Sequence, residues 1–117
     1  MREIRQRGPY QYVFGRYAEP IATVSPGETV AIYTEDAFES RITRAEDRPS
    51  EILGPYLNPQ TGPIYVESAE PGDTLVVRML DLAPTRDWAV SAFIPYFGGL
   101  TATKFTHLLH EPLPEKV

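Results

Sequence analysis

The sequence predicts an all-β fold with many turns. Twelve prolines and eight glycines interrupt the 117 residues, and few long segments carry the apolar spacing of an amphipathic helix. Short apolar stretches instead follow Pro-Gly pairs, with the period of two that is typical of strands. Because 42% of the residues are hydrophobic, we expect a globular chain, and its length fits one domain spanning residues 1–117.

The bulk composition narrows the possible functions. A formal net charge of −5 argues against nucleic acid or an anionic membrane surface as the main partner. The chain has no cysteine, which excludes disulfides, thiolate catalysis and cysteine-ligated metal within it, and favours a cytoplasmic location. No apolar run reaches membrane-spanning length, and the N-terminus lacks a signal-peptide core.

The first segment places arginines before a group of aromatic residues. Tyr10, Tyr12 and Phe14 alternate along the chain, which predicts an edge strand with one aromatic face. Basic residues near aromatic ones also occur in nucleic-acid-binding surfaces, but the net acidity and the short run disfavour that interpretation. We expect this strand to pack on a neighbouring element or subunit.

Residues 18–34 are predicted to form two strands joined by a turn. A short strand around residues 21–24 leads into the Pro26-Gly27 turn, and a second strand follows at residues 29–34. Proline pre-sets the first central position of such a turn, and glycine accepts the positive φ of the second. Glu35 and Asp36 close the second strand.

Residues 37–57 are predicted to be mainly irregular. Charges of both signs alternate through residues 37–47, as in a solvated loop or a single helical turn at the surface. Pro49 is suited to begin a short helix, which Gly54-Pro55 would end. A connection of this length usually serves a purpose, either as a binding loop or by lying against another part of an assembly.

The stretch that organises the chain is residues 58–82, which read as turn, strand, turn, strand. In the first strand, Ile64 and Val66 alternate with Tyr65 and Glu67. The Pro71-Gly72 turn follows. The second strand is apolar on both faces, so we expect it in the middle of a packed sheet. Its two faces are Leu75, Val77 and Met79 on one side and Val76, Arg78, Leu80 and Leu82 on the other.

Residues 24–36 and 69–81 resemble each other. In both, Pro-Gly is followed by an acidic residue, a threonine, a run of strand-forming residues and a final aspartate. Two interpretations are open: an old duplication, or two strands that begin with the same turn chemistry, which is a common way to enter a strand.

The last part of the chain contains a strand at residues 89–94, an aromatic loop with Gly98 and Gly99, and a segment with His107 and His110. A Gly-Gly pair lets the main chain pass close to another group or forms a tight turn. On a helix the two histidines would share a face, which suits a metal. Prolines follow them and no third ligand is near, so surface or interface histidines are the default interpretation, and we assign no metal ligand to this chain.

Three stretches together resemble the N-terminal portion of the acetamidase/formamidase family. The main one is LNPQTGPIYVESAEPGDTLVVRMLDLAP, supported by VSPGETVAIYTEDAF before it and FIPYFGGL after it. The resemblance covers residues 18–117. It implies a jelly-roll-like β-sandwich and an amidohydrolase that converts small linear amides, of the formamide or acetamide type, to a carboxylate and ammonia.

The chain departs from the family pattern in two places. Family members are much longer, and the glycine-, aspartate- and histidine-rich motifs expected at their metal or catalytic centre lie downstream of this chain. After Asp36 the family tends to continue with glycines, whereas this chain reads Ala-Phe-Glu-Ser-Arg-Ile, a change that could alter the substrate. We therefore expect a sandwich that is incomplete without a second chain or domain.

The resemblance and the strand pattern together select candidate site residues. Asp36, at a strand end, is the catalytic candidate, as a base, an orienting group or a metal ligand; its alternative role is to cap the next turn. Glu35 should face the opposite way. Gly98 and Gly99 are candidates for contact with substrate. Asp73 reads as a turn residue, and Glu67 as either an interior or a solvent-facing group.

The leading hypothesis is an N-terminal amidase subunit or fragment bound to a second polypeptide that carries the rest of the enzyme, in a higher oligomer. A split enzyme, chain cleavage or truncation would each give such a piece. Any divalent metal would be held mainly by the partner. The alternative is a non-catalytic β-sandwich that serves in binding or assembly. A solitary enzyme is disfavoured, because no nucleophile–base pair can be identified.

Overall fold

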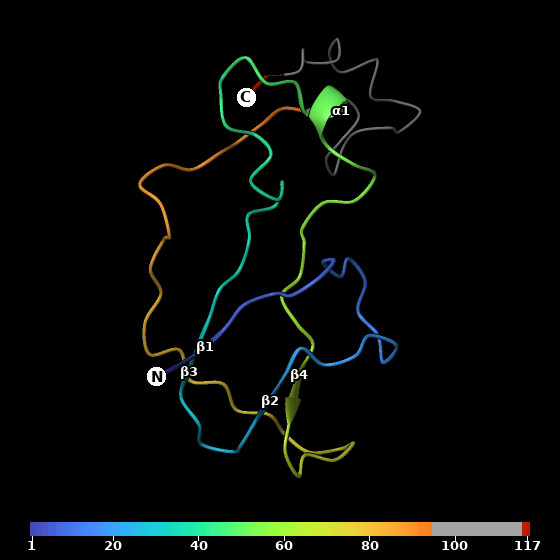
Figure 1. Cartoon of the computed structure of the whole chain (residues 1–117), viewed down its shortest axis with the longest axis vertical. Coiled ribbons are helices and arrows are strands. Elements are labelled where there is room, and N and C mark those ends of the chain that lie inside the picture. Colours follow the sequence, from blue (N-terminus) through green and yellow to red (C-terminus); the bar gives the residue numbers. More distant parts are fainter. Residues whose placement is uncertain (95–115) are drawn as a thin grey trace, which may run out of the picture.

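The computed structural model describes residues 1–94 and 116–117, and this part of the chain contains much extended backbone and little helix. Four strands of three residues each and one helical turn make up its regular structure (Figure 1). The strands pair in two separate two-stranded sheets, β1 with β3 and β2 with β4. This agrees with the predicted all-β class, while the sandwich arrangement stays a prediction.

The first sheet joins β1 (Arg2–Ile4) to β3 (Val30–Ile32) in parallel, with Ile4 opposite Ile32. The Tyr33 N–H continues the ladder by donating to the Ile4 carbonyl at 3.0 Å. Strand β3 lies within the strand predicted at residues 29–34. Strand β1 was not predicted, because a single apolar residue beside two charged ones gives no alternating pattern.

The second sheet joins β2 (Ala22–Val24) to β4 (Ile64–Val66), also in parallel, with Ala22 opposite Ile64. One further main-chain hydrogen bond extends the ladder at each end, from Ile21 N–H to the Pro63 carbonyl and from Glu67 N–H to the Val24 carbonyl, both 2.9 Å. Both strands were predicted, and both are shorter than expected.

The two Pro-Gly turns have the same hydrogen bonds. Gly27 and Gly72 have φ angles of +81° and +103°, the region that glycine adopts without strain. In each turn the N–H of the residue before proline donates to the side chain of the acidic residue that follows glycine. The N–H of this acidic residue donates to the carbonyl of the residue before proline. The pairs are Ser25 with Glu28, at 3.0 and 3.0 Å, and Glu70 with Asp73, at 2.9 and 3.1 Å. The predicted turn role of Asp73 is confirmed.

The predicted central strand at residues 75–82 is not paired with any strand in the described part of the chain, and its place in a packed sheet stays a prediction. Every residue from 67 to 85 is exposed, and Val76 is 84% exposed. In Figure 1 the trace that follows β4 carries no strand arrow in this part of the chain. An apolar pattern on both faces needs neighbours on both sides, and the described residues supply none.

Two other predicted strands are each reduced to a single bridge. Near the aromatic group, only Gln11 pairs, with Gln60, and Phe14 is 94% exposed. In the stretch 89–94, only Phe93 pairs, with Lys116. Alternation of apolar residues thus indicated extended backbone in both places, but a ladder requires a partner along its whole length.

Helix α1 (Pro49–Ile52) confirms the predicted short helix. Proline occupies the first turn, and the Leu53 N–H closes the helix on the Pro49 carbonyl at 2.9 Å. Nowhere in residues 1–94 or 116–117 does a helix have both the length and the apolar character needed to cross a bilayer.

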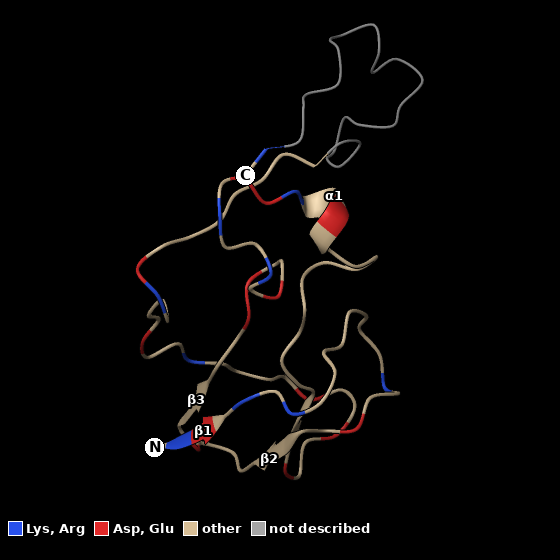
Figure 2. Ribbon diagram, turned by 45° about the horizontal axis from the view of Figure 1, so that its top comes forward, with Lys and Arg blue, Asp and Glu red and all other residues tan. Residues whose placement is uncertain are grey.

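The loop between β3 and α1 has charged side chains at the surface and two buried side chains, Ile42 and Asp47. Figure 2 shows acidic and basic segments interleaved along it, as predicted for residues 37–47. Ile42 is nevertheless fully buried, and Asp47 is 9% exposed. The Asp47 Oδ2 atom accepts N–H hydrogen bonds from Thr43 at 2.8 Å and Arg44 at 3.0 Å. These bonds lower the pKa of Asp47.

Ile4 and Ile42 are the buried hydrophobic residues of the described core. We predict that Ile42→Ala lowers the free energy of unfolding by about 2–5 kcal/mol, because the substitution leaves a cavity where the side chain was fully buried. Ile32→Ala is the matched control, since Ile32 is 47% exposed. Urea unfolding measures both variants, and equal losses would contradict the described core.

Candidate functional site

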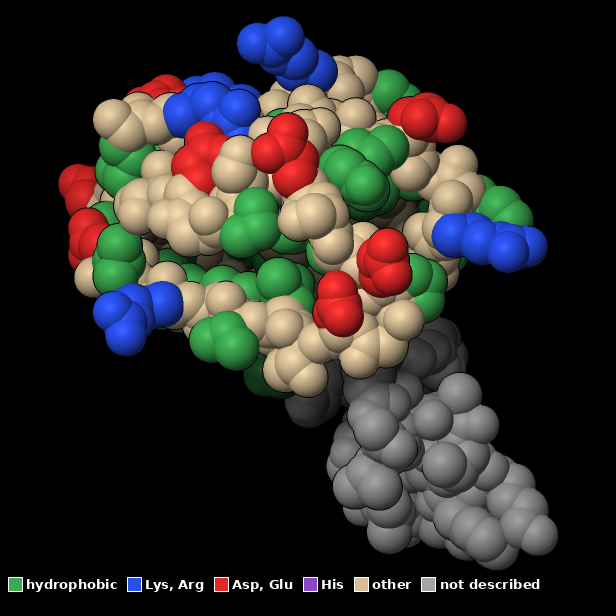
Figure 3. All heavy atoms as spheres, turned by 90° about the horizontal axis from the view of Figure 1, so that it is seen from below, with side chains coloured by type: hydrophobic (Ala, Val, Ile, Leu, Met, Phe, Trp, Pro, Cys, Tyr) green, Lys and Arg blue, Asp and Glu red, His purple; other side chains and the backbone are tan. Residues whose placement is uncertain are grey.

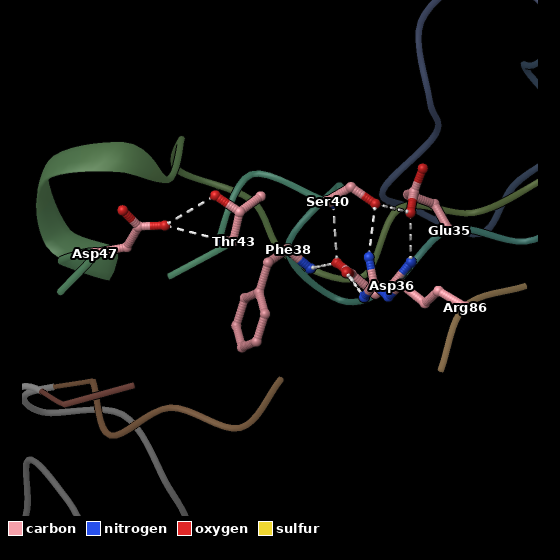
Figure 4. A network of polar contacts seen from close by, with 7 residues as sticks. All are labelled: Glu35, Asp36, Phe38, Ser40, Thr43, Asp47 and Arg86. Atoms are coloured by element: carbon pink, nitrogen blue, oxygen red, sulfur yellow. Dashed lines mark hydrogen bonds and ion pairs between the residues drawn. The ribbon is translucent and has the colours of Figure 1, made fainter. Parts of the chain in front are cut away.

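Asp36 lies at the centre of a polar network just beyond β3 (Figure 4). Its Oδ1 atom accepts two N–H hydrogen bonds, from Phe38 at 2.7 Å and from Ser40 at 3.1 Å. These bonds close the turn at residues 37–40, a role that aspartate favours. The other oxygen, Oδ2, forms an ion pair with Arg86. The alternative role of Asp36 as a turn cap is thus present, together with a distant charged partner.

Arg86 connects this turn to a loop 50 residues further along the chain. Besides its pair with Asp36, it donates from Nη1 to the Ser40 Oγ atom at 3.1 Å. Its guanidinium carbon lies 4.0 Å from the centre of the Trp88 ring, a cation–π contact. About a quarter of the Arg86 side chain is exposed, so the guanidinium is enclosed by these three residues.

Glu35 joins the same network, which corrects the prediction that it faces away from Asp36. Its Oε1 atom accepts the Asp36 N–H at 3.0 Å and the Ser40 hydroxyl at 2.6 Å. The prediction assumed that the strand continues through residue 36, where neighbouring side chains would alternate. Because β3 ends at Ile32, that alternation no longer applies, and both carboxylates approach Ser40.

The turn carries two residues in the left-handed region of the backbone. Glu39 and Ser40 both have φ of +54°, which is uncommon for residues with a Cβ atom. Each costs on the order of 1–3 kcal/mol, and such strain persists only where the surroundings enforce it. The hydrogen bonds of Ser40 with Asp36, Glu35 and Arg86 provide that enforcement.

The charges of the network hold Asp36 in its ionised form. Partial burial disfavours the charge, but the hydrogen bonds from Arg86, Ser40 and Phe38 outweigh it, so the pKa of Asp36 lies below its ordinary value. An aspartate of this kind stays negative at neutral pH. It can orient a cation or accept hydrogen bonds, and it is a poor donor of protons.

Tyr10 lies close enough to this turn for the charges of the turn to affect its pKa. Burial raises the pKa of the Tyr10 phenol, and the negative charges of Glu35 and Glu39 raise it further. The negative charge of the acidic turn therefore acts on Tyr10, although the N-terminal aromatic group does not form the predicted strand.

The remaining candidates fall outside this network. The Glu67 Oε2 atom accepts the Ser25 hydroxyl at 2.6 Å, which links the end of β4 to the first Pro-Gly turn. Gly98, Gly99, His107 and His110 lie outside the described residues. Within the described part of the chain, no group of three histidine, cysteine, aspartate or glutamate side chains is placed to hold a metal ion.

Sequence reasoning found Asp36 but missed Ser40 and Arg86. Ser40 lies in a loop with mixed charges, and Arg86 lies in a polar loop far along the sequence. Neither carries a local pattern, because the ion pair that unites them exists only after folding.

We predict that Arg86→Gln raises the pKa of Asp36 toward its ordinary value, since the substitution removes both the guanidinium charge and the ion pair. Arg78→Gln is the matched control, because Arg78 is exposed and makes no ion pair in the described residues. Carboxyl titration by NMR measures the shift. An unchanged Asp36 titration in Arg86→Gln would contradict the network.

The stability of the chain should fall in acid. A folded-state pKa below the unfolded value, about 3.9 for aspartate, means that ionised Asp36 stabilises the fold at higher pH. That contribution is lost as the pH falls through the folded pKa. Asp47 acts in the same direction. We therefore expect Asp36→Asn to lose less stability than the wild type when urea unfolding is repeated from about pH 5 down to pH 2; an equal loss would contradict it.

Comparisons with known proteins place this chain in a family. The chain matches the model of the Acetamidase/Formamidase family over residues 9–112. No curated protein sequence matches it. Among solved structures it is similar to an acetamidase from Yersinia enterocolitica, with 36% identity and a TM-score of 0.71, over 98% of this chain and 36% of that chain.

A second similar structure is an acetamidase from Bacillus halodurans, with 34% identity and a TM-score of 0.55. That match covers 61% of this chain and 24% of the other. The chain thus spans about a third or less of each of these two proteins. By the family match and by the Yersinia similarity across nearly its whole length, the chain belongs to the acetamidase/formamidase family of amide hydrolases and fits the N-terminal portion of its members.

Proposed function

We propose that this chain is the N-terminal β-sandwich part, as a subunit or fragment, of an amidohydrolase that cleaves small linear amides to a carboxylate and ammonia. The observation that carries the proposal is the match of 98% of the chain to one acetamidase at 36% identity. On this proposal residues 1–117 form a single jelly-roll-like domain of a cytoplasmic, higher oligomeric enzyme.

Most of the catalytic residues then belong to a second polypeptide. Amide hydrolysis requires an activated nucleophile or water, donors for the developing oxyanion and an acid for the leaving amine. The described residues contain no nucleophile–base–acid set of this kind. Since the chain corresponds to 36% of the Yersinia enterocolitica acetamidase, the missing groups are assigned to the part of the fold that this chain lacks.

The contribution of this chain is to shape and charge one wall of the site. Among the three roles open to Asp36, its hydrogen bonds favour the orienting one: the ionised carboxylate fixes Arg86 and the Ser40 turn. The Ser40 hydroxyl already donates to Glu35, so the further N–H groups of the Arg86 guanidinium offer hydrogen-bond donors to a substrate carbonyl or a carboxylate product. Gly98 and Gly99 are proposed to let the main chain approach the substrate.

A divalent metal, if the enzyme uses one, is proposed to be held mainly by the second polypeptide. The described residues fit such an ion poorly. Both oxygens of Asp36 are engaged by hydrogen bonds, and one oxygen of Glu35 receives both of its bonds. Of these carboxylate oxygens, at most the Oε2 atom of Glu35 remains to bind a metal. Such a metal would supply an activated water to the reaction.

The alternative function is a non-catalytic β-sandwich for binding or assembly. One observation favours it: among the described residues, the hydrogen bonds of the Asp36 carboxylate are all made within the fold, so the network can be explained by stability alone. The two functions differ in whether disturbing Asp36 changes turnover in a folded protein.

The test of the proposal is a chimera in which this chain replaces the matching part of the Yersinia enterocolitica acetamidase. We expect it to release ammonia from formamide or acetamide, because the missing groups are then present in one polypeptide. The unmodified Yersinia protein is the positive control. A chimera that folds, as judged by circular dichroism, but releases no ammonia from either amide would contradict the proposal.

We predict that Asp36→Asn in the chimera lowers kcat by at least about 10-fold, because loss of the charge releases Arg86 from its position. Asp87→Asn is the matched control, since Asp87 is exposed and makes no hydrogen bond or ion pair in the described residues. Ammonia release and urea unfolding are measured on both variants. Normal turnover in a stable Asp36→Asn chimera would favour the assembly function.

A further inference from the structure

We propose that residues 75–82 form a strand of a sheet that is completed by a second polypeptide carrying the rest of the acetamidase fold. This inference rests on the proposed function and adds to it the place where the two polypeptides meet. It follows from the internal sequence similarity, from the main-chain hydrogen bonds and from the exposed side chains.

The first argument compares the two similar segments. Residues 24–36 and 69–81 begin with turns that have the same hydrogen bonds. In the first segment the chain then enters β3, which pairs with β1. The equivalent of Val30–Ile32 in the second segment is residues 75–77, which pair with nothing in the described part of the chain. The same entry chemistry therefore leads to a strand where a neighbour exists.

The second argument is the main chain itself. Across residues 74–82, the hydrogen bond found among the described residues is a local one, from the Leu82 N–H to the Asp81 Oδ1 atom at 2.9 Å. Six of these residues are Leu, Val or Met, whose side chains favour burial. Burial requires partners for the main-chain N–H and C=O groups, so a segment of this composition needs an adjacent strand.

The third argument is the exposure of the apolar side chains of this segment. Leu75, Val77 and Met79 are between 67% and 71% exposed, and Val76, Leu80 and Leu82 are between 65% and 86% exposed. Both faces of the segment thus lie in water. Figure 3 shows apolar side chains at the surface between charged ones on one face of the molecule. Six exposed large apolar side chains within eight residues favour an interaction with another polypeptide.

A second copy of this chain is a poor occupant. If two copies of the segment pair in parallel and in register, Arg78 lies opposite Arg78, and like charges directly opposite each other destabilise a sheet. The rest of the acetamidase fold is the better occupant, because this chain accounts for 36% of the Yersinia protein. The pairing strand should be apolar, with an acidic or polar side chain opposite Arg78.

Hydrogen–deuterium exchange tests the contact directly. The probe is the remainder of the Yersinia enterocolitica acetamidase, expressed as a separate polypeptide and mixed with the full 117-residue chain. We expect amides 75–81 to exchange rapidly in the chain alone and at least about 100-fold more slowly in the complex. Three outcomes would overturn the inference: no complex, a complex without protection there, or protection already present in the chain alone.

A pair of matched variants tests the side chains. Val77→Asp should weaken binding of the same probe at least about 10-fold, because a carboxylate would be buried in the sheet. Val13→Asp should leave it unchanged, since Val13 is 71% and Val77 69% exposed in the chain alone. Calorimetry measures the affinity, and circular dichroism checks both folds. Equal affinities for the two variants would overturn the inference.

The chimera separates this inference from the proposed function. Protection of amides 75–81 in the two-chain complex together with an inactive chimera would support the contact and contradict the amidase activity. An active chimera, together with a two-chain complex in which amides 75–81 are not protected, would support the amidase activity and contradict the contact.

Discussion

The main-chain groups of a β-strand must pair with a neighbouring strand, and this requirement decides which extended segments of the chain become strands. Strands β1 and β3 meet, as do β2 and β4, and in each pair the two segments come from distant parts of the sequence. Residues 75–82 have the stronger apolar pattern but no described neighbour, and they remain exposed. The side-chain pattern therefore determines which segments are extended, and the presence of a neighbouring strand determines which of them form a sheet.

The ion pair between Arg86 and Asp36 is the long-range polar contact that positions the candidate site. It places the loop after the unpaired segment against the turn after β3. The turn holds two residues with left-handed backbone angles, and the contacts of Ser40 within the network offset that strain. Charge and backbone conformation are thus coupled at one place, which is where the family resemblance also placed the catalytic candidate.

Whether a feature could be predicted from the sequence depends on how far apart in the chain its residues lie. The Pro-Gly turns and the short helix at Pro49 depend on neighbouring residues, and both were predicted. Asp36 was found because it ends a recognisable strand pattern. Strand β1 was missed because only Ile4 marks it, and Arg86 because its partner lies 50 residues away. The strand at residues 75–82 was placed in a sheet because its pattern implies neighbours, and the sequence of this chain does not show whether they are present.

The unpaired segment and the candidate site are next to each other in the chain, and this has a consequence for how the enzyme would be assembled. Arg86 follows Leu82 by four residues. If residues 75–82 become a central strand, the end of that strand fixes where the loop with Arg86 and Trp88 begins. Completion of the sheet would then also set the position of the guanidinium against Asp36 and Ser40. On the proposed assembly, the second polypeptide therefore contributes to the site in two ways, through its own residues and by fixing Arg86, and activity depends on strand pairing even where the pairing residues contact no substrate.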